Sequence, residues 1–180
     1  MSNTKKPIII SLAVCTIFYI LLAIWKGPFF PIVKFHYWMG FIKQSKGDLV
    51  GCIKSYNASN DWDKDYPTAY ISRGSAYMDL KEYEKAISDY TTAIKLSPEN
   101  EEPYAYRGRA YYEIDYLKNS KDDFDHAIRL NKDFVYAYSN RALLKYTKLN
   151  DKTGGCEDLK KATELGDEDS KKYLENHYCD

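Results

Sequence analysis

The side chains that most often carry chemistry are sparse in this sequence and do not form a catalytic pattern. Three histidines, His36, His126 and His177, are widely spaced, and no His-x-x-x-His or Cys-x-x-Cys pattern occurs. Glycine-rich phosphate-binding patterns and the Gly-x-Ser-x-Gly nucleophile pattern are also absent from the sequence. Adjacent carboxylates such as Asp122 and Asp123 are typical of solvated helix surfaces. The sequence therefore predicts a protein that is not an enzyme and has neither a cofactor nor a metal site.

Two cysteines near the C-terminus are spaced so that they could form a covalent bond. If a helix over 156–165 is antiparallel to a second helix over about 168–178, the first rises ~14 Å from Cys156 and the second returns ~16 Å to Cys179. Both sulfurs then lie at the same end of the hairpin. A disulfide there would hold the chain terminus and requires an oxidising compartment. Two free thiols, or a metal site with His177, are the alternatives.

The elements that must position such residues repeat along the chain. Small and aromatic residues recur at intervals of 34 in several columns: Gly40, Gly74, Gly108 and Ala142; Leu49, Tyr83 and Leu117; Tyr56, Tyr90 and Phe124. Apolar residues within each unit recur at steps of three and four, the spacing of a helix with one buried face. A small residue lets two helices approach closely, and an aromatic side chain of the partner helix fills the space beside it. A fourth copy keeps the register after one inserted residue near Asp151–Gly155.

The two central copies carry the pattern of a known repeat family. The second copy reads Tyr70…Gly74…Tyr77…Ala86…Tyr90…Ala93…Pro98, and the third reads Tyr104…Gly108…Tyr111…Phe124…Ala127. On these residues the chain resembles the tetratricopeptide repeat (TPR) family, whose 34-residue unit is a helix–turn–helix. The resemblance covers about residues 33–169. It implies an all-α fold, a right-handed α-solenoid of about four repeats.

We expect four helix pairs and one terminal helix. The pairs are expected at 34–46 with 49–60, 67–80 with 83–96, 101–114 with 117–130, and 135–148 with 156–165. The corresponding repeats are about 33–66, 67–100, 101–134 and 135–169, within a solenoid domain over 32–180. A helix over about 168–178 has Tyr173 and Leu174 on one face and charged residues elsewhere. An apolar inner side and a polar outer side are what a capping helix needs.

A second internal pattern predicts an ion pair within each of the last three repeats. Each carries an arginine before the small-residue column and an aspartate in one column of the second helix: Arg73 with Asp89, Arg107 with Asp123, and Arg141 with Asp158. The first copy has Met39 and Ser55 at these places, so it loses both partners together. We therefore expect three Arg–Asp pairs. Solvated charges on helix faces are the alternative.

The N-terminal segment differs in composition from the repeats. Ile8–Trp25 is a run of eighteen residues without a charge, long enough as a helix to span ~27 Å, close to the ~30 Å of a bilayer core. Residues 1–47 contain six lysines and no acidic residue. No small-residue cleavage site follows the run, so an uncleaved single-pass anchor is favoured over a signal peptide. We expect a cytoplasmic tail, a transmembrane helix and a Pro/aromatic linker over residues 1–31.

The charge pattern decides little about orientation, because lysines flank the apolar run on both sides. The short N-terminal tail favours a solenoid on the exported side, either periplasmic or extracellular. A cytoplasm-facing solenoid is the alternative for a membrane protein, and a secreted TPR protein is the alternative if the segment is cleaved.

The family resemblance also implies a concave groove that binds a peptide or a helix of another protein. The groove positions carried over from the family are Tyr37, Phe41, Gln44, Ile71, Ser75, Met78, Asp79, Glu102, Arg109, Tyr112, Glu113, Tyr136, Ser139, Leu143 and Tyr146. Some of these tyrosines could instead pack between helices. The family's clamp for acidic C-termini needs Lys and Asn on this surface, and Arg109 alone is basic among these positions in the second to fourth copies. A receptor for such tails is therefore not expected.

Together these observations predict a non-enzymatic protein–protein interaction module that holds its partner at a membrane surface. Rigid aromatic side chains contribute contact area at low entropic cost. The formal net charge of +0 gives no general reason to expect nucleic acid, and no small-molecule substrate is expected. A structural subunit of a larger membrane or envelope assembly is the alternative.

Overall fold

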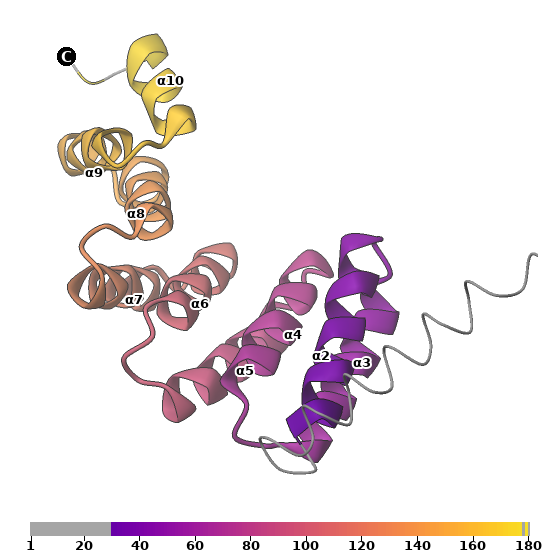
Figure 1. Ribbon diagram of the computed structural model, residues 1–180. Coiled ribbons are helices and arrows are strands. Elements are labelled where there is room, and N and C mark those ends of the chain that lie inside the picture. Colours follow the sequence, from indigo (N-terminus) through magenta and orange to yellow (C-terminus); the bar gives the residue numbers. More distant parts are fainter. Residues whose placement is uncertain (1–29, 178, 180) are drawn as a thin grey trace, which may run out of the picture. The chain divides into compact units, whose positions relative to one another are not determined.

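All regular structure in the described part of the chain is α-helical (Figure 1). The computed structural model describes residues 30–177 and residue 179. The helices are α2 (Phe30–Ser45), α3 (Leu49–Trp62), α4 (Pro67–Asp79), α5 (Tyr83–Leu96), α6 (Glu102–Glu113), α7 (Leu117–Leu130), α8 (Val135–Thr147), α9 (Lys152–Glu164) and α10 (Glu168–His177). The order is four helix pairs followed by a single helix, as the 34-residue spacing predicts. The chain divides into two units, Met1–Ala69 and Tyr70–Asp180.

The membrane anchor expected over residues 8–25 lies outside the described residues. Within residues 30–177, no helix is both long and apolar enough to cross a membrane.

Two helices begin earlier than the sequence predicted. Helix α2 begins at Phe30 rather than at 34, with Pro31 in its first turn, where a missing N–H costs no helical hydrogen bond. Helix α9 begins at Lys152 rather than at 156. The cause at α9 is an N-cap, because the carboxylate of Asp151 accepts a hydrogen bond from the N–H of Gly154 at 2.9 Å. Thr153, Gly154 and Gly155, which resemble a turn in the sequence, are therefore helical.

The turn inside each repeat explains the inserted residue. Three residues join the paired helices in the first three repeats, at 46–48, 80–82 and 114–116, and four do so in the last, at 148–151. Each turn contains one residue with positive φ: Gly47, Lys81, Asp115 and Asn150. The insertion therefore lies in this turn, ahead of the predicted position at 151–155.

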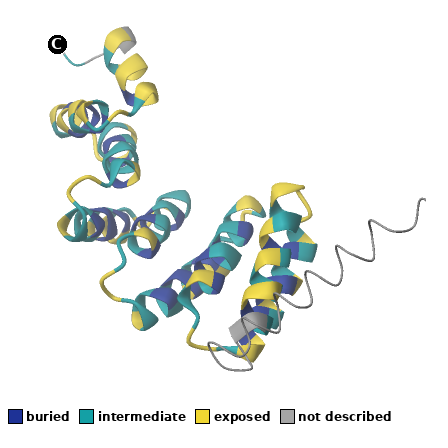
Figure 2. Ribbon diagram, viewed as in Figure 1, coloured by how far each residue is buried: buried dark blue, intermediate teal, exposed yellow. Residues whose placement is uncertain are grey.

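Close contacts between small and aromatic residues hold each pair together, as predicted. Tyr90 and Phe124 are at most 1% exposed. A Cβ atom built on Gly74 would lie 2.7 Å from Cε1 of Tyr90, and one built on Gly108 would lie 3.0 Å from Cε1 of Phe124. Real side chains do not tolerate the first distance, so glycine is required for this approach of α4 to α5. Figure 2 shows the buried positions of these pairs on their facing sides.

The three predicted Arg–Asp pairs are confirmed, and all are bidentate. In each, Nε and one terminal nitrogen of the arginine bond the two carboxylate oxygens at 2.6–2.8 Å: Arg73 with Asp89, Arg107 with Asp123, and Arg141 with Asp158. In Arg107 and Arg141 the third nitrogen also bonds the preceding repeat, since Arg107 donates to Thr91 at 3.0 Å and Arg141 to Asp125 at 2.5 Å. All three arginines therefore join the helices within a repeat, and Arg107 and Arg141 also join consecutive repeats.

The first repeat replaces the ion pair with a hydrogen bond from a lysine to a serine hydroxyl. Lys43 donates from Nζ to the hydroxyl of Ser55 at 3.0 Å. Tyr56 is fully buried in this unit, and its hydroxyl donates to Gln44 at 2.9 Å. This copy lacks the arginine and the aspartate together, so position 55 is a serine and no carboxylate is buried there.

Candidate functional site

A polar cavity of about 580 Å³ lies among α4, α5, α6 and α8. It is lined by Ser75, Met78, Asp79, Lys81, Tyr83, Tyr90, Tyr106, Arg109, Glu113 and Tyr136. We call it the repeat groove. Because α4, α6 and α8 are the first helices of consecutive repeats, the groove forms where successive repeats place these helices beside one another. Six of the residues carried over from the family lie in it: Ser75, Met78, Asp79, Arg109, Glu113 and Tyr136.

Three tyrosine rings form a connected aromatic wall in the repeat groove. The ring centroids of Tyr90 and Tyr106 are 5.8 Å apart, and those of Tyr106 and Tyr136 are 5.1 Å apart in an edge-on arrangement. Burial raises the pKa of Tyr136 to about 12 and also raises the pKa of Tyr90 and Tyr106. At neutral pH the three phenols are therefore protonated, and Tyr90, which is 1% exposed, packs beneath the groove.

Arg109 is held by its neighbours inside the groove. Its Nε and one terminal nitrogen donate to Glu113 at 2.9 and 2.6 Å, and the other terminal nitrogen donates to Asn140 at 3.1 Å. The guanidinium also lies 5.2 Å from the ring centroid of Tyr112. Its charge is therefore compensated by Glu113, and its main role is to join α6 to α8.

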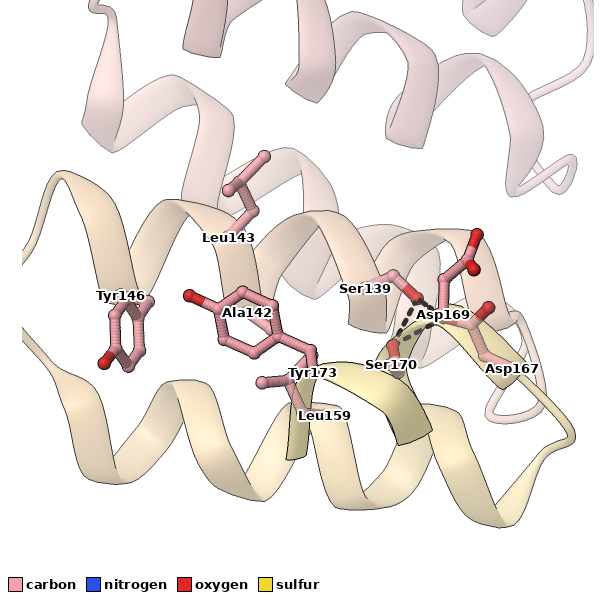
Figure 3. A pocket seen from close by; sticks show the side chains of 9 residues that line it. All are labelled: Ser139, Ala142, Leu143, Tyr146, Leu159, Asp167, Asp169, Ser170 and Tyr173. Carbon is pink, nitrogen blue, oxygen red and sulfur yellow. Dashed lines mark hydrogen bonds between the residues drawn. The ribbon is translucent and has the colours of Figure 1, made fainter. Parts of the chain in front are cut away.

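A smaller, mainly apolar pocket lies where α10 covers α8 and α9 (Figure 3). Its volume is about 190 Å³, and its lining residues are Ser139, Ala142, Leu143, Tyr146, Leu159, Asp167, Asp169, Ser170 and Tyr173. We call it the cap pocket. Leu143 and Tyr146, which the family resemblance assigns to the groove of the repeats, line this pocket instead. The rings of Tyr146 and Tyr173 meet edge to face with centroids 5.8 Å apart.

A hydrogen-bonded cluster closes one end of the cap pocket. The hydroxyls of Ser170 and Ser139 donate to the same carboxylate oxygen of Asp167, at 2.5 and 2.7 Å, as the dashed lines in Figure 3 show. The hydrogen bond from Ser170 is the largest cause that lowers the pKa of Asp167, and the one from Ser139 adds to it. Asp167 is therefore ionised at neutral pH and links α8 to the start of α10.

A third, open hollow shares lining residues with the other two. It has a volume of about 610 Å³ and is lined by Asp133, Phe134, Val135, Tyr136, Ser139, Asp167 and Asp169. Tyr136 also lines the repeat groove, and the last three residues also line the cap pocket. The three hollows therefore follow one another along α8, within the unit that begins at Tyr70.

The other residues assigned to the groove have different surroundings. Ile71 is 8% exposed and packs in the core with Ala86 and Tyr90, so it does not line the repeat groove. Tyr112 packs against the buried core cluster that includes Phe124. Its hydroxyl forms a hydrogen bond with the hydroxyl of Thr147 at 3.1 Å. Neither residue lines the repeat groove.

Tyr37 and Phe41 belong to the N-terminal unit. The ring of Tyr37 packs at 5.8 Å from Tyr56 and 5.6 Å from Tyr66, whereas Phe41 is 55% exposed. Tyr37 is thus one of the tyrosines that pack between helices.

Four lining residues of the repeat groove were missed from the sequence: Lys81, Tyr83, Tyr90 and Tyr106. Tyr106 lies one helical turn before Arg109, and this spacing could have identified it. Tyr90 was assigned to the core column, and it belongs to both, because its ring is buried beneath the groove.

Cys156 and Cys179 are joined in a disulfide, with their Cα atoms 5.5 Å apart. The bond joins Cys179, two residues after the end of α10, to Cys156 in the first half of α9. The hairpin geometry considered from the sequence, with both sulfurs at one end, is the geometry that the structure has.

Comparisons with known proteins agree with this architecture. Residues 74–115 match the family model described as TPR repeat, and no curated protein sequence matches the chain. A crystal structure of MamA protein is similar at 24% identity with a TM-score of 0.66, covering 74% of this chain and 73% of that chain. MamA from Desulfovibrio magneticus RS-1 is similar at 17% identity with a TM-score of 0.67, covering 74% and 75%.

A third similar structure contains a bound peptide. It is the first TPR of Spaghetti (RPAP3) bound to the HSP90 peptide SRMEEVD, at 23% identity with a TM-score of 0.62, covering 64% of this chain and 91% of that chain. At these identities the likeness shows the fold. The described part of this chain is therefore an all-α TPR solenoid of about four repeats and a cap.

Proposed function

We propose that this TPR solenoid is a protein–protein interaction module that holds a peptide or a helical segment of a partner in the repeat groove. The observation that carries the proposal is the aromatic wall of Tyr90, Tyr106 and Tyr136 along an open cavity of about 580 Å³. Tyrosine provides a large, rigid contact surface and a hydrogen-bond donor, the combination found in binding hot spots. The similar TPR of Spaghetti, bound to an HSP90 peptide, supports the same use of the fold.

The groove chemistry supports a partner that differs from an acidic C-terminal peptide. Arg109 is already paired with Glu113, and Asp79 adds a second carboxylate to the lining. An acidic tail would therefore meet like charges and only one further lysine, Lys81. Binding and presentation, without a chemical reaction, is the function that this lining favours.

A photo-crosslinking experiment tests the proposed use of the groove. We would place benzoylphenylalanine at position 106 in the full chain, irradiate intact cells of the source organism, and identify adducts by mass spectrometry. The matched control is position 116, since Tyr116 is 58% exposed and does not line the groove. A discrete adduct from 106 and none from 116 is expected. Equal adducts from both positions, or none from 106, would contradict the proposal.

We further propose that residues 8–25 anchor the module in a membrane, with the solenoid on the exported side. The uncharged run Ile8–Trp25 supports the anchor. Phe35 and Trp38, 50% and 62% exposed on α2, follow it closely together with Lys34, a composition typical of membrane interfaces. The disulfide supports the exported side, because such bonds persist in oxidising compartments.

Labelling of Cys179 tests this topology. An impermeant maleimide applied to intact cells should label Cys179 only after treatment with an impermeant reductant. Labelling without reductant would show a free thiol, and labelling only after lysis would place the solenoid on the cytoplasmic side.

A further inference from the structure

We propose that the cap pocket is a second anchoring site for the partner, and that it takes a leucine- or phenylalanine-sized side chain whose neighbour in the partner is Lys or Arg. The inference rests on the proposed function, since it assumes a bound peptide, and it specifies the chemistry of that peptide.

The first part of the argument is the apolar hollow itself. At about 190 Å³ it exceeds the ~150 Å³ apolar cavity that is known to take up benzene, so one large apolar side chain fits. Leu143, Tyr146, Leu159 and Tyr173 provide its apolar end, as Figure 3 shows. Tyr173 is 41% exposed, so the pocket opens to solvent at this side.

The incomplete cover of α10 explains why the hollow exists. Helix α10 has 10 residues, whereas α8 and α9 have 13 each. In a solenoid, each repeat buries the apolar face of its neighbour, and a single short helix covers that face only in part. The disulfide between Cys156 and Cys179 holds the end of α10 against α9, so the pocket keeps its shape before a partner arrives.

The second part of the argument is charge. The described residues that line the cap pocket and the adjoining open hollow include three carboxylates, Asp133, Asp167 and Asp169, and neither Lys nor Arg. Asp167 is fixed by Ser139 and Ser170, and Asp169 has a side chain that is 92% exposed, with Lys172 at 3.3 Å. An exposed pair of this kind compensates little of the negative charge. A cationic side chain of a partner is therefore complementary to this rim.

The two parts play different roles in binding. Burial of the apolar side chain supplies most of the affinity. The solvent-exposed carboxylates supply selectivity and a dependence on salt, as rim charges generally do. Because Tyr136 lines both the open hollow and the repeat groove, one peptide can occupy the groove and the cap pocket together.

The test uses four peptides and the full chain. The peptides are Ac-Ser-Gly-Leu-Arg-Gly-Ser-NH2 and its three variants with Ala for Leu, with Glu for Arg, and with both changes. The 180-residue protein, labelled at the methyl groups of Ala, Leu and Met, is titrated in the presence of lipid nanodiscs. Ala142, Leu143 and Leu159 report on the cap pocket, and Met78 reports on the repeat groove.

The Leu-Arg peptide should shift the methyl signals of Ala142, Leu143 and Leu159 and saturate. Its affinity should exceed that of the Leu-Glu peptide by roughly threefold or more at low ionic strength, and the difference should shrink at high salt. The two Ala peptides should bind most weakly.

Charge-reversal variants test the rim without touching the core. Asp133→Lys with Asp169→Lys should remove the preference for Arg or reverse it, because it replaces two negative charges of the rim by positive ones. Both residues are exposed, so the core is unchanged. Asp122→Lys, on the exposed side of α7, is the matched control and should leave the preference unchanged. Circular dichroism of each variant checks that the helices are retained.

The outcomes separate this inference from the proposed function. If Met78 shifts while the three cap-pocket methyls do not, the inference is wrong and the groove proposal stands. Equal affinities for the Leu-Arg and Leu-Glu peptides, or no saturable shift in the cap pocket, also overturn it. Shifts in the cap pocket alone support the inference and leave the groove to the crosslinking experiment.

Discussion

At the scale of single residues, two kinds of contact recur among the repeats and set the approach of the paired helices. The first is a glycine placed under an aromatic ring, as in Gly74 with Tyr90. The second is a bidentate arginine that joins two helices and then extends to the preceding repeat, as in Arg107 with Asp123 and Thr91. Both contacts fix the distance between helices, and through it the spacing of the groove tyrosines.

We expect Gly74→Ala to lower the free energy of unfolding by about 1 kcal/mol. The added methyl overpacks the site by about 1–3 kcal/mol, and the gain in helix propensity of ~1 kcal/mol offsets part of this. Gly108→Ala should cost less, since its Cβ would lie 3.0 Å from the ring against 2.7 Å at Gly74. Urea denaturation checks both. The explanation fails if Gly74→Ala combined with Tyr90→Leu costs the full sum of the single variants.

The arginine pairs predict strong coupling in a double-mutant cycle. Removing one partner leaves the other charge partly buried, so Arg107→Met and Asp123→Ser should each destabilise by about 3 kcal/mol. The double variant should lose clearly less stability than the sum of the two single variants, because it reproduces in the third repeat the combination that the first repeat has at Met39 and Ser55. Strict additivity in chemical denaturation would show that the side chains act independently.

At the scale of elements, the turns and the cap decide where the repeats end. A turn with one residue of positive φ joins the helices of every repeat, and the last turn is one residue longer. Helix α10 is joined to α8 through Asp167 and to α9 through the disulfide. These two attachments hold α10 over the cap pocket.

The attachment through Asp167 predicts a pH dependence of stability. Its pKa is lowered below the ordinary 3.8, mainly by the hydrogen bond from Ser170, so ionised Asp167 stabilises the fold above pH 3.8 and this contribution is lost as the pH falls through the lowered pKa. Asp167→Asn should therefore be less stable than the natural protein at neutral pH, and the difference should vanish in acid. Asp169→Asn, whose side chain is 92% exposed, is the control. A difference that persists unchanged in acid would contradict the explanation.

At the scale of the whole chain, most of the helical order could be predicted because it follows from columns 34 residues apart. The Arg–Asp pairs could be predicted for the same reason, since Met39 and Ser55 show that both partners change together. The start of α9 could not, because a single carboxylate at Asp151 turns a glycine-rich stretch into helix. The cap pocket could not be predicted either, because it depends on how α10 packs on α8 and α9.

The groove was predicted only in part, and the reason is physical. Positions carried over from a family identify a helix face, but tertiary packing decides which of them are open. Ile71 is turned into the core, and Leu143 and Tyr146 line the cap pocket under α10. The membrane anchor over residues 8–25 lies outside the described residues and stays a prediction.

The central claim is that the aromatic wall of the repeat groove holds the partner. The most direct measurement is the affinity of the segment identified by crosslinking for the full chain and for Tyr106→Ala and Tyr116→Ala. A groove hot spot predicts a loss of at least about tenfold for Tyr106→Ala and less than about twofold for Tyr116→Ala. Equal affinities for the two variants, with helical content unchanged, would contradict the account.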